Sequence, residues 1–300
     1  MLLSNLTQWV GSNLSEKEAI KIIADAGFDA YDISLFKLTR DENYQFNSDD
    51  YVNIAKDLRK YADSLGIVCN QSHAPFPSSI GKAEEDKVIY EKIVRAMEIA
   101  SILGAKIIVV HPVQHLNYAE HAEELFQMNV EFYKSLIPYC KKFGIKVACE
   151  NMWQCNNGNN GNNVPSDSTC SRAWEFCKYL DAIDSEWIVG CLDIGHVSLM
   201  NADIPEFIRK MGNKHLQALH VHDTDYKSDK HTAPFMEKID FIAICKALAE
   251  IDYKGDFTFE ADAFYKGKPV ELYPATTKYL CEIGRYLVSQ VENYNTNAQN

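Results

Sequence analysis

The 300-residue chain lacks several features that mark common classes of protein. No run reaches the roughly 18 to 20 consecutive apolar residues that a membrane-spanning helix needs. Residues 1–5 lack the basic and long apolar parts of a signal peptide, so we expect a cytoplasmic protein with no membrane segment. No Gly-x-Gly-x-x-Gly pattern follows the first apolar run, which argues against a dinucleotide-binding fold.

Basic residues are also scarce, because Lys and Arg total 30 against 42 Asp and Glu, for a net charge of −12. Such an acidic total disfavours a surface that attracts nucleic acid, although a local basic groove is compatible with it. The nine cysteines are scattered without a Cys-x-x-Cys pair, and Cys69, Cys149 and Cys191 lie within apolar runs. Such cysteines are typical of buried residues in a reducing compartment, so we expect neither a disulfide framework nor a thiolate zinc site.

What the chain does contain is a repeated order of amphipathic helix, glycine and β-branched run. Ser15 and Glu18 form a capping box that opens the first helix. The glycines at these junctions suit the left-handed conformation that ends a helix; they are Gly27, Gly66, Gly104, Gly144 and Gly255. The periodicity predicts a helix that ends before residue 104 and further helices over residues 16–26, 49–65, 119–143, 171–180, 204–211, 241–251 and 275–292.

With residues 2–9 as the first strand, the chain contains eight strands, each followed by a helix. This alternation predicts a parallel sheet, and eight such units favour a closed barrel, so we expect an α/β fold of one domain, a (β/α)8 TIM barrel. The barrel should span residues 1–292, followed by a disordered polar tail over residues 293–300. The low-complexity segment 154–164 is either a flexible connection or a mobile flap over a site.

Six of the apolar runs end in a side chain that can bind a metal or carry a proton, namely His73, His111, Glu150, Asp193, His220 and Glu260. In a barrel the carboxyl ends of the strands meet at one rim, so we expect these side chains to converge. Each alone could be a surface or helix-capping residue. Four of them, Glu150, Asp193, His220 and Glu260, supply three carboxylates and one imidazole, which suits Mn²⁺, Mg²⁺ or Co²⁺ better than a structural zinc.

Two glutamates beside one metal ion suggest a reaction. A metal that chelates a carbonyl and the neighbouring hydroxyl lowers the cost of removing the proton between them. One glutamate could remove that proton as a base and the other return it as an acid. This is isomerisation or epimerisation of a sugar through a metal-bound enediolate.

The stretches around these residues resemble the xylose-isomerase-like TIM-barrel superfamily, particularly its sugar isomerases and epimerases of the tagatose 3-epimerase and hydroxypyruvate isomerase type. The matching stretches are residues 72–75 (SHAP), 110–112 (VHP), 150–151 (EN), 192–196 (LDIGH), 220–223 (HVHD) and 259–260 (FE). The resemblance implies that Glu150, Asp193, His220 and Glu260 hold one divalent ion, Mn²⁺ before Mg²⁺, Co²⁺ or Zn²⁺. It also implies that Glu150 and Glu260 are the catalytic acid and base.

The same resemblance implies substrate contacts and an assembly. His196 would hold a substrate hydroxyl, whereas His73 and His111 would line the pocket or be satisfied core imidazoles. Trp9 and Trp153 would stack on a sugar face or pack in the core. The implied partners are a small sugar and further copies of the chain, in a homodimer or homotetramer.

One segment keeps a second activity open. Asp229-Lys230-His231 resembles the third-metal ligands of endonuclease IV, a trinuclear zinc phosphodiesterase of the same superfamily, and His73, His111 and His196 complete its nine ligand positions. The loops after His73 and His111 contain few basic residues, and no basic-aromatic cluster suits insertion into a duplex, so nucleic acid is not the favoured partner. Asp229 and His231 would then bind polar substrate groups or lie on a solvated loop. A keto-sugar lyase is a third alternative, because elimination begins with the same proton abstraction.

Overall fold

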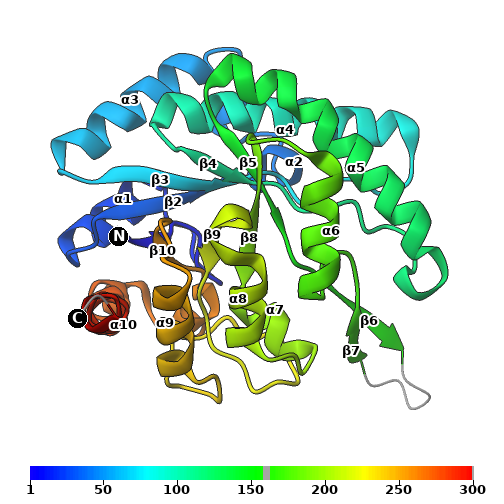
Figure 1. Cartoon of the computed structure of the whole chain (residues 1–300). Helices are drawn as coiled ribbons and strands as arrows, with labels where there is room; N and C mark the ends of the chain where they lie inside the picture. Colours follow the sequence, from blue (N-terminus) through cyan, green and yellow to red (C-terminus); the bar gives the residue numbers. More distant parts are fainter. Residues whose placement is uncertain (158–162, 299–300) are drawn as a thin grey trace.

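The computed structural model of the chain describes residues 1–157 and 163–298, and its centre is an eight-stranded parallel sheet. An isolated bridge between Val221 and Phe259 joins the two edges of this sheet, so the barrel is nearly closed. This confirms the predicted single-domain (β/α)8 barrel (Figure 1). In chain order the strands are β1 (Leu3–Leu6), β2 (Ala30–Ser34), β3 (Val68–His73), β4 (Ile107–Val109), β5 (Lys146–Glu150), β8 (Ile188–Asp193), β9 (Leu216–His220) and β10 (Phe257–Phe259).

The helices lie on the outside of the barrel (Figure 1). The capping box of the first helix is present: Ser15 Oγ accepts from Glu18 N at 3.4 Å and Glu18 Oε2 from Ser15 N at 2.8 Å. None of the helices in residues 1–157 and 163–298 is long and apolar enough to cross a membrane. They are α1 (Glu16–Asp25), α2 (Lys37–Arg40), α3 (Tyr51–Ser64), α4 (Ala83–Leu103), α5 (Tyr118–Phe143), α6 (Ala173–Ile183), α7 (Ile194–Leu199), α8 (Ile204–His215), α9 (Phe241–Glu250) and α10 (Tyr273–Ala298), with 3-10 turns η1 (Gln45–Asn47), η2 (Asp262–Tyr265) and η3 (Val270–Leu272).

A layer of small apolar side chains supports the rim on which the candidate site lies. Alternate residues of a strand point to the same face of the sheet. The residue two positions before each of four predicted site residues therefore lies directly beneath it. These residues form one buried cluster with Val189, and they are Val109, Ala148, Cys191 and Ala218. All nine cysteines are free thiols.

Gly255 differs from the other junction glycines. Gly27, Gly66, Gly104 and Gly144 adopt the predicted positive φ, between 66° and 101°. Gly255 is not among the positive-φ residues. A Cβ at this position would lie 2.2 Å from Tyr253 Oη and 2.5 Å from the Gln217 carbonyl oxygen, so close packing accounts for the glycine.

The segment predicted as a loop or flap is partly a β-hairpin. Its flanks form the antiparallel strands β6 (Trp153–Asn157) and β7 (Asn163–Asp167), which project from the barrel (Figure 1). Gln154 fixes the base of the hairpin, because its side chain donates to the Leu116 carbonyl at 2.8 Å and accepts from Tyr118 N at 3.0 Å. The flexible-connection prediction is therefore wrong for the flanks, whereas the predicted flap tip, residues 158–162, lies outside the described residues.

The predicted disordered tail is wrong over residues 293–298, because α10 continues to Ala298. Val288 and Val291 of this helix are buried. No glycine or proline interrupts the polar sequence that follows, so helical hydrogen bonding continues beyond the packed part. Residues 299–300 lie outside the description.

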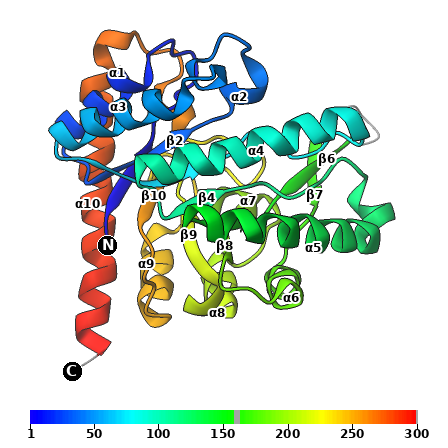
Figure 2. The same ribbon diagram turned by 90° about the horizontal axis from the view of Figure 1, so that it is seen from above.

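The amino-terminal half of the barrel is joined to α10 by an ion pair. The Arg285 guanidinium donates to both carboxylate oxygens of Asp29, at 2.6 and 2.7 Å, and to the Gly27 carbonyl at 2.7 Å. Figure 2 shows α10 running along this side of the molecule. Burial raises the pKa of Asp29, but the hydrogen bonds from Arg285 and Leu3 N and the positive charge of Arg285 together outweigh it, so the pKa lies below its ordinary value.

We expect Arg285→Met to lower the free energy of unfolding by about 1 kcal/mol or less at neutral pH, because the ion pair is partly exposed. Since the folded-state pKa of Asp29 is depressed, its stabilisation is present above the unfolded pKa of about 4 and lost as the pH falls below it. Thermal unfolding at pH 7 and pH 3 checks this. A difference between the two proteins that is as large at pH 3 as at pH 7 would contradict the ion pair.

Candidate active site

Four predicted ligands meet at the carboxyl ends of the strands. Glu150, Asp193, His220 and Glu260 each present one ligand atom, and these atoms all lie within 4.8 Å of one another. All four side chains are buried, with Glu260 the most exposed at 8%. Three buried carboxylates in one cluster are costly unless positive charge compensates them. The cluster therefore fits a cation.

The side-chain nitrogen and oxygen atoms of these residues are arranged for metal ligation better than for hydrogen bonding to one another. His220 Nδ1 lies 3.3 Å from Glu150 Oε1 and 3.2 Å from Glu260 Oε2. Neither nitrogen of the His220 ring nor Glu150 Oε2 has a hydrogen-bond partner of suitable geometry. Buried polar atoms rarely remain unsatisfied, and three carboxylates with one imidazole are a normal ligand set for Mn²⁺ or a similar divalent ion.

His73 and His111 flank the cluster and do not pack in the apolar core. His73 Nε2 lies 3.2 Å from Glu260 Oε1, and its ring stacks on that of His220 with centroids 4.3 Å apart. His111 Nε2 lies 3.2 Å from Glu150 Oε2. Each of the two glutamates is thus held between His220 and one outer histidine.

A second cluster adjoins the first. His196, Asp229 and His231 present ligand atoms within 4.8 Å of one another. Asp229 Oδ2 lies 3.4 Å from His196 Nε2 and 3.2 Å from His231 Nε2, and it accepts a hydrogen bond from Trp153 Nε1 at 3.4 Å. His231 Nδ1 lies 2.9 Å from the Glu260 carbonyl oxygen, so the two clusters are joined. The structure therefore places Asp229 and His231 at the site and not on a fully solvated loop.

The two tryptophans differ in position. Trp153 begins β6 and contacts Asp229, so it lies at the site. Trp9 is 2% exposed and stacks on Tyr265, with ring centroids 4.3 Å apart. The core alternative is correct for Trp9.

Neighbouring imidazoles lower the pKa values of the two buried glutamates. Burial raises the pKa of Glu150, but the imidazoles of His220 and His111 outweigh it and bring the pKa to about 2. The pKa of Glu260 is likewise lowered well below its ordinary value, against burial, by His220 and His73. Burial lowers the pKa of His111 to about 4, although the Glu150 carboxylate opposes this shift.

Sequence reasoning missed two buried residues that position the site. Asp32, in the middle of β2, lies 3.0 Å from His73 Nδ1. His222 Nε2 lies 3.0 Å from each carboxylate oxygen of Asp193, and its ring stacks on His231 at 3.9 Å. The signals were a carboxylate inside an apolar run and a second histidine two positions after His220, hence on the same face.

A third missed residue, Asp223, holds the loop that carries Asp229 and His231. Its buried carboxylate accepts hydrogen bonds from four backbone amides, those of Thr224, Glu237, Lys238 and Ile239, at 2.8 to 3.1 Å. We expect Asp223→Asn to lower the free energy of unfolding by about 2 kcal/mol. The NH₂ group of the new side chain is a donor, and it would face a backbone N–H group that needs an acceptor. Urea denaturation and amide hydrogen exchange over residues 237–239 check this.

Asp225→Asn is the matched control, because Asp225 accepts amide bonds in the same loop but is more exposed. Asp225→Asn should lower the free energy of unfolding clearly less than Asp223→Asn does. Equal costs would contradict the anchoring role of Asp223.

Gly195 sets the position of His222. A Cβ at residue 195 would lie 2.0 Å from His222 Cε1. We expect Gly195→Ala to displace the ring from Asp193 and to cost about 1 to 3 kcal/mol, the range for overpacking. In a His222→Ala background the same change should cost much less, since the obstructing ring is gone. Thermal unfolding of the four proteins checks this, and strictly additive costs would contradict it.

The chain matches known proteins over nearly its whole length. A family model described as xylose isomerase-like TIM barrel matches residues 20–283. An uncharacterized protein of Methanocaldococcus jannaschii is 26% identical over 246 residues, which cover 79% of this chain and 76% of that protein.

Solved structures share the fold. A D-psicose 3-epimerase structure determined in the presence of D-fructose superimposes with a TM-score of 0.73 at 14% identity, covering 96% of this chain and 99% of that one. A D-tagatose 3-epimerase-like protein gives 0.72 at 23% identity, covering 97% and 100%. The extent of the family match and the shared barrel lead to one conclusion: the chain belongs to the xylose isomerase-like TIM-barrel family.

Proposed function

We propose that the protein is a divalent-metal-dependent sugar isomerase or epimerase. The observation that carries the proposal is the placement of Glu150 and Glu260 on either side of His220, within one buried cluster of four residues that could hold a metal ion. When bound there, Mn²⁺ or a related ion supplies Lewis-acid polarisation of a substrate carbonyl and its neighbouring hydroxyl. The family and the epimerase structures of the same fold support sugar chemistry.

The proton transfers are assigned to the two glutamates. One carboxylate removes the proton from the carbon beside the substrate carbonyl, and an enediolate results. In epimerisation the other glutamate must enter the step protonated, and it gives its proton to the opposite face of the same carbon, so the two side chains exchange protonation states. In isomerisation a protonated glutamate gives its proton to the neighbouring carbon, while the hydroxyl proton moves to the former carbonyl oxygen. His73 and His111 are positioning residues, because each contacts one oxygen of one glutamate, at 3.2 Å. His196, Asp229, His231 and Trp153 are proposed to bind the substrate hydroxyls.

A panel of ketoses and aldoses, incubated in D₂O with the Mn²⁺-loaded protein, tests the proposal. We expect an epimer or isomer of at least one sugar, with deuterium at the carbon beside the carbonyl. A shielded proton can return without exchange, so the product is identified by NMR as well. No conversion of any sugar, with the metal bound, would contradict the proposal.

The second cluster keeps an endonuclease IV-like zinc phosphodiesterase as the other candidate. The observation that favours this candidate is that His196, Asp229 and His231 form a second group that could hold a metal ion, beside the first group. Three zinc ions per chain together with cleavage of an abasic DNA strand would favour it over sugar chemistry. A keto-sugar lyase would reveal itself in the same sugar panel by a product that has lost a group.

A further inference from the structure

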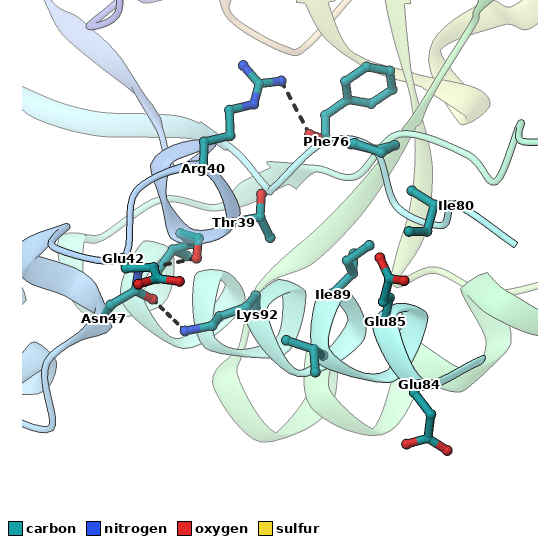
Figure 3. Close-up of a pocket in the computed structure, with 13 residues that line it drawn as sticks. Thr39, Arg40, Glu42, Asn47, Phe76, Ile80, Glu84, Glu85, Ile89 and Lys92 are labelled. Atoms are coloured by element: carbon teal, nitrogen blue, oxygen red, sulfur yellow. Dashed lines mark hydrogen bonds between the residues drawn. The ribbon is translucent and has the colours of Figure 1, made fainter. Parts of the chain in front are cut away.

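A large cavity lies beside the candidate active site and takes no part in the chemistry described so far. It has a volume of about 1000 Å³ and is bounded by α2, η1, the segment after β3 and α4 (Figure 3). Because α2 follows β2 and residues 76–80 follow β3, the cavity opens on the same rim of the barrel as the site. Its apolar lining consists of Leu38, Phe76, Pro77, Ile80, Val88 and Ile89.

Two phenylalanines separate this cavity from the candidate active site. The Phe76 ring lies 4.7 Å from the ring of His111, and the Phe36 ring lies 5.6 Å from that of His73. On the cavity side, the Arg40 guanidinium lies 4.8 Å from the Phe36 ring and donates to the Phe76 carbonyl at 3.2 Å. The site and the cavity are therefore one aromatic side chain apart.

The charges around the cavity decide what kind of group it can take. Arg40 and Lys92 are its two cations, and Lys92 Nζ donates to Asn47 Oδ1. Three carboxylates, those of Glu42, Glu84 and Glu85, also line it. Since positive charge is not in excess, a phosphate or another anion gains little there. The apolar surface favours a neutral hydrophobic group, as in most small-molecule pockets of this size.

We propose that the substrate is a sugar with a neutral apolar substituent away from the reacting carbons, and that this substituent occupies the α2–α4 cavity. This inference rests on the proposed sugar isomerase or epimerase activity, and it specifies the class of sugar on which the protein acts. The reacting carbons lie at Glu150 and Glu260, and the substituent extends along the rim over the partly exposed side chains of Phe36 and Phe76. A free monosaccharide would leave the cavity without an occupant.

Ketohexoses and their 6-O-benzyl ethers are the probes. With the Mn²⁺-loaded protein, we expect kcat/KM for at least one ether to exceed that of its parent sugar by about tenfold or more, since a hydrophobic group in a fitting pocket contributes at least that much. Val88→Trp fills the cavity from an exposed position of α4 and should abolish this preference while leaving the parent sugar unaffected. Lys87→Trp is the matched control on the same helix outside the cavity lining, and it should preserve the preference.

The outcomes separate the two proposals. Turnover of parent sugars with no preference for any ether, or an equal loss for both in Val88→Trp, overturns the inference and leaves the proposed function intact. No turnover of any sugar overturns the proposed function and with it the assignment of a sugar substrate. Binding of benzyl alcohol, followed by NMR in the same three proteins, tests the cavity separately, and its absence from the wild-type protein also overturns the inference.

Discussion

Glu260→Gln is expected to lower kcat on the sugar substrate by about 10³-fold, within the range that general acid-base catalysis contributes. Glutamine keeps the size of the side chain, but its amide can neither take nor return a proton. The carboxylate it replaces lies between His73 and His220, at 3.2 Å from each, and it is nearly inaccessible to solvent. No water can therefore easily take over its role.

The metal content of this variant must be measured together with its turnover, because Glu260 also belongs to the ligand cluster. Retained metal with lost turnover assigns the effect to proton transfer, whereas loss of both assigns it to ligation. Glu250→Gln is the control, since Glu250 pairs with Arg209 at the surface. If Glu260→Gln keeps turnover within tenfold of the wild type, the mechanism with two glutamates is wrong.

Asp193→Asn is expected to weaken Mn²⁺ binding by about 100-fold or more, because even partners of ligands affect metal affinity by 10- to 100-fold. Asp193 combines two roles. Its carboxylate belongs to the ligand cluster and also caps α7 by accepting from His196 N at 2.7 Å. Asparagine is an equally good N-cap, so the start of the helix should be preserved while a charged ligand is lost.

Asp203→Asn provides the matched control for this experiment. Asp203 caps α8 in the same way, accepting from Glu206 N at 2.8 Å, but is not part of the cluster. Titration calorimetry with Mn²⁺ should therefore show a loss for Asp193→Asn alone. Equal affinities in the two variants would contradict the ligand role of Asp193.

The strand ends could be predicted from sequence because a parallel barrel brings them together whatever the loops do. His73, Glu150, Asp193 and His220 are the last residues of their strands, and Glu260 follows its strand directly. Strand periodicity alone therefore places these side chains at one rim. Their distances and burial depend on tertiary packing, which no local pattern shows.

The features that sequence reasoning missed depend on contacts between distant segments. Asp32 meets His73 across 41 residues, and Asp223 binds amides 14 to 16 residues later in the chain. The polar carboxyl-terminal residues and the flanks of the Asn/Gly segment gave no apolar periodicity, although both form regular hydrogen-bonded structure. Low apolar content was mistaken for the absence of structure.

The α2–α4 cavity could not be predicted for a related reason. Apart from α4, its walls come from a four-residue helix, a 3-10 turn and a connecting segment, none of which is long enough to show a hydrophobic period. The large hydrophobic residues that line it are individually unremarkable in the sequence. Only their arrangement around Arg40 and the two phenylalanines forms the cavity.

Anomalous diffraction from crystals grown with Mn²⁺ tests the central claim most directly. We expect a strong peak enclosed by the side chains of Glu150, Asp193, His220 and Glu260, with ligand distances of about 2.0 to 2.2 Å. A peak only beside Asp229, or none at the rim of a metal-saturated protein, would contradict the claim that these four residues form the metal centre.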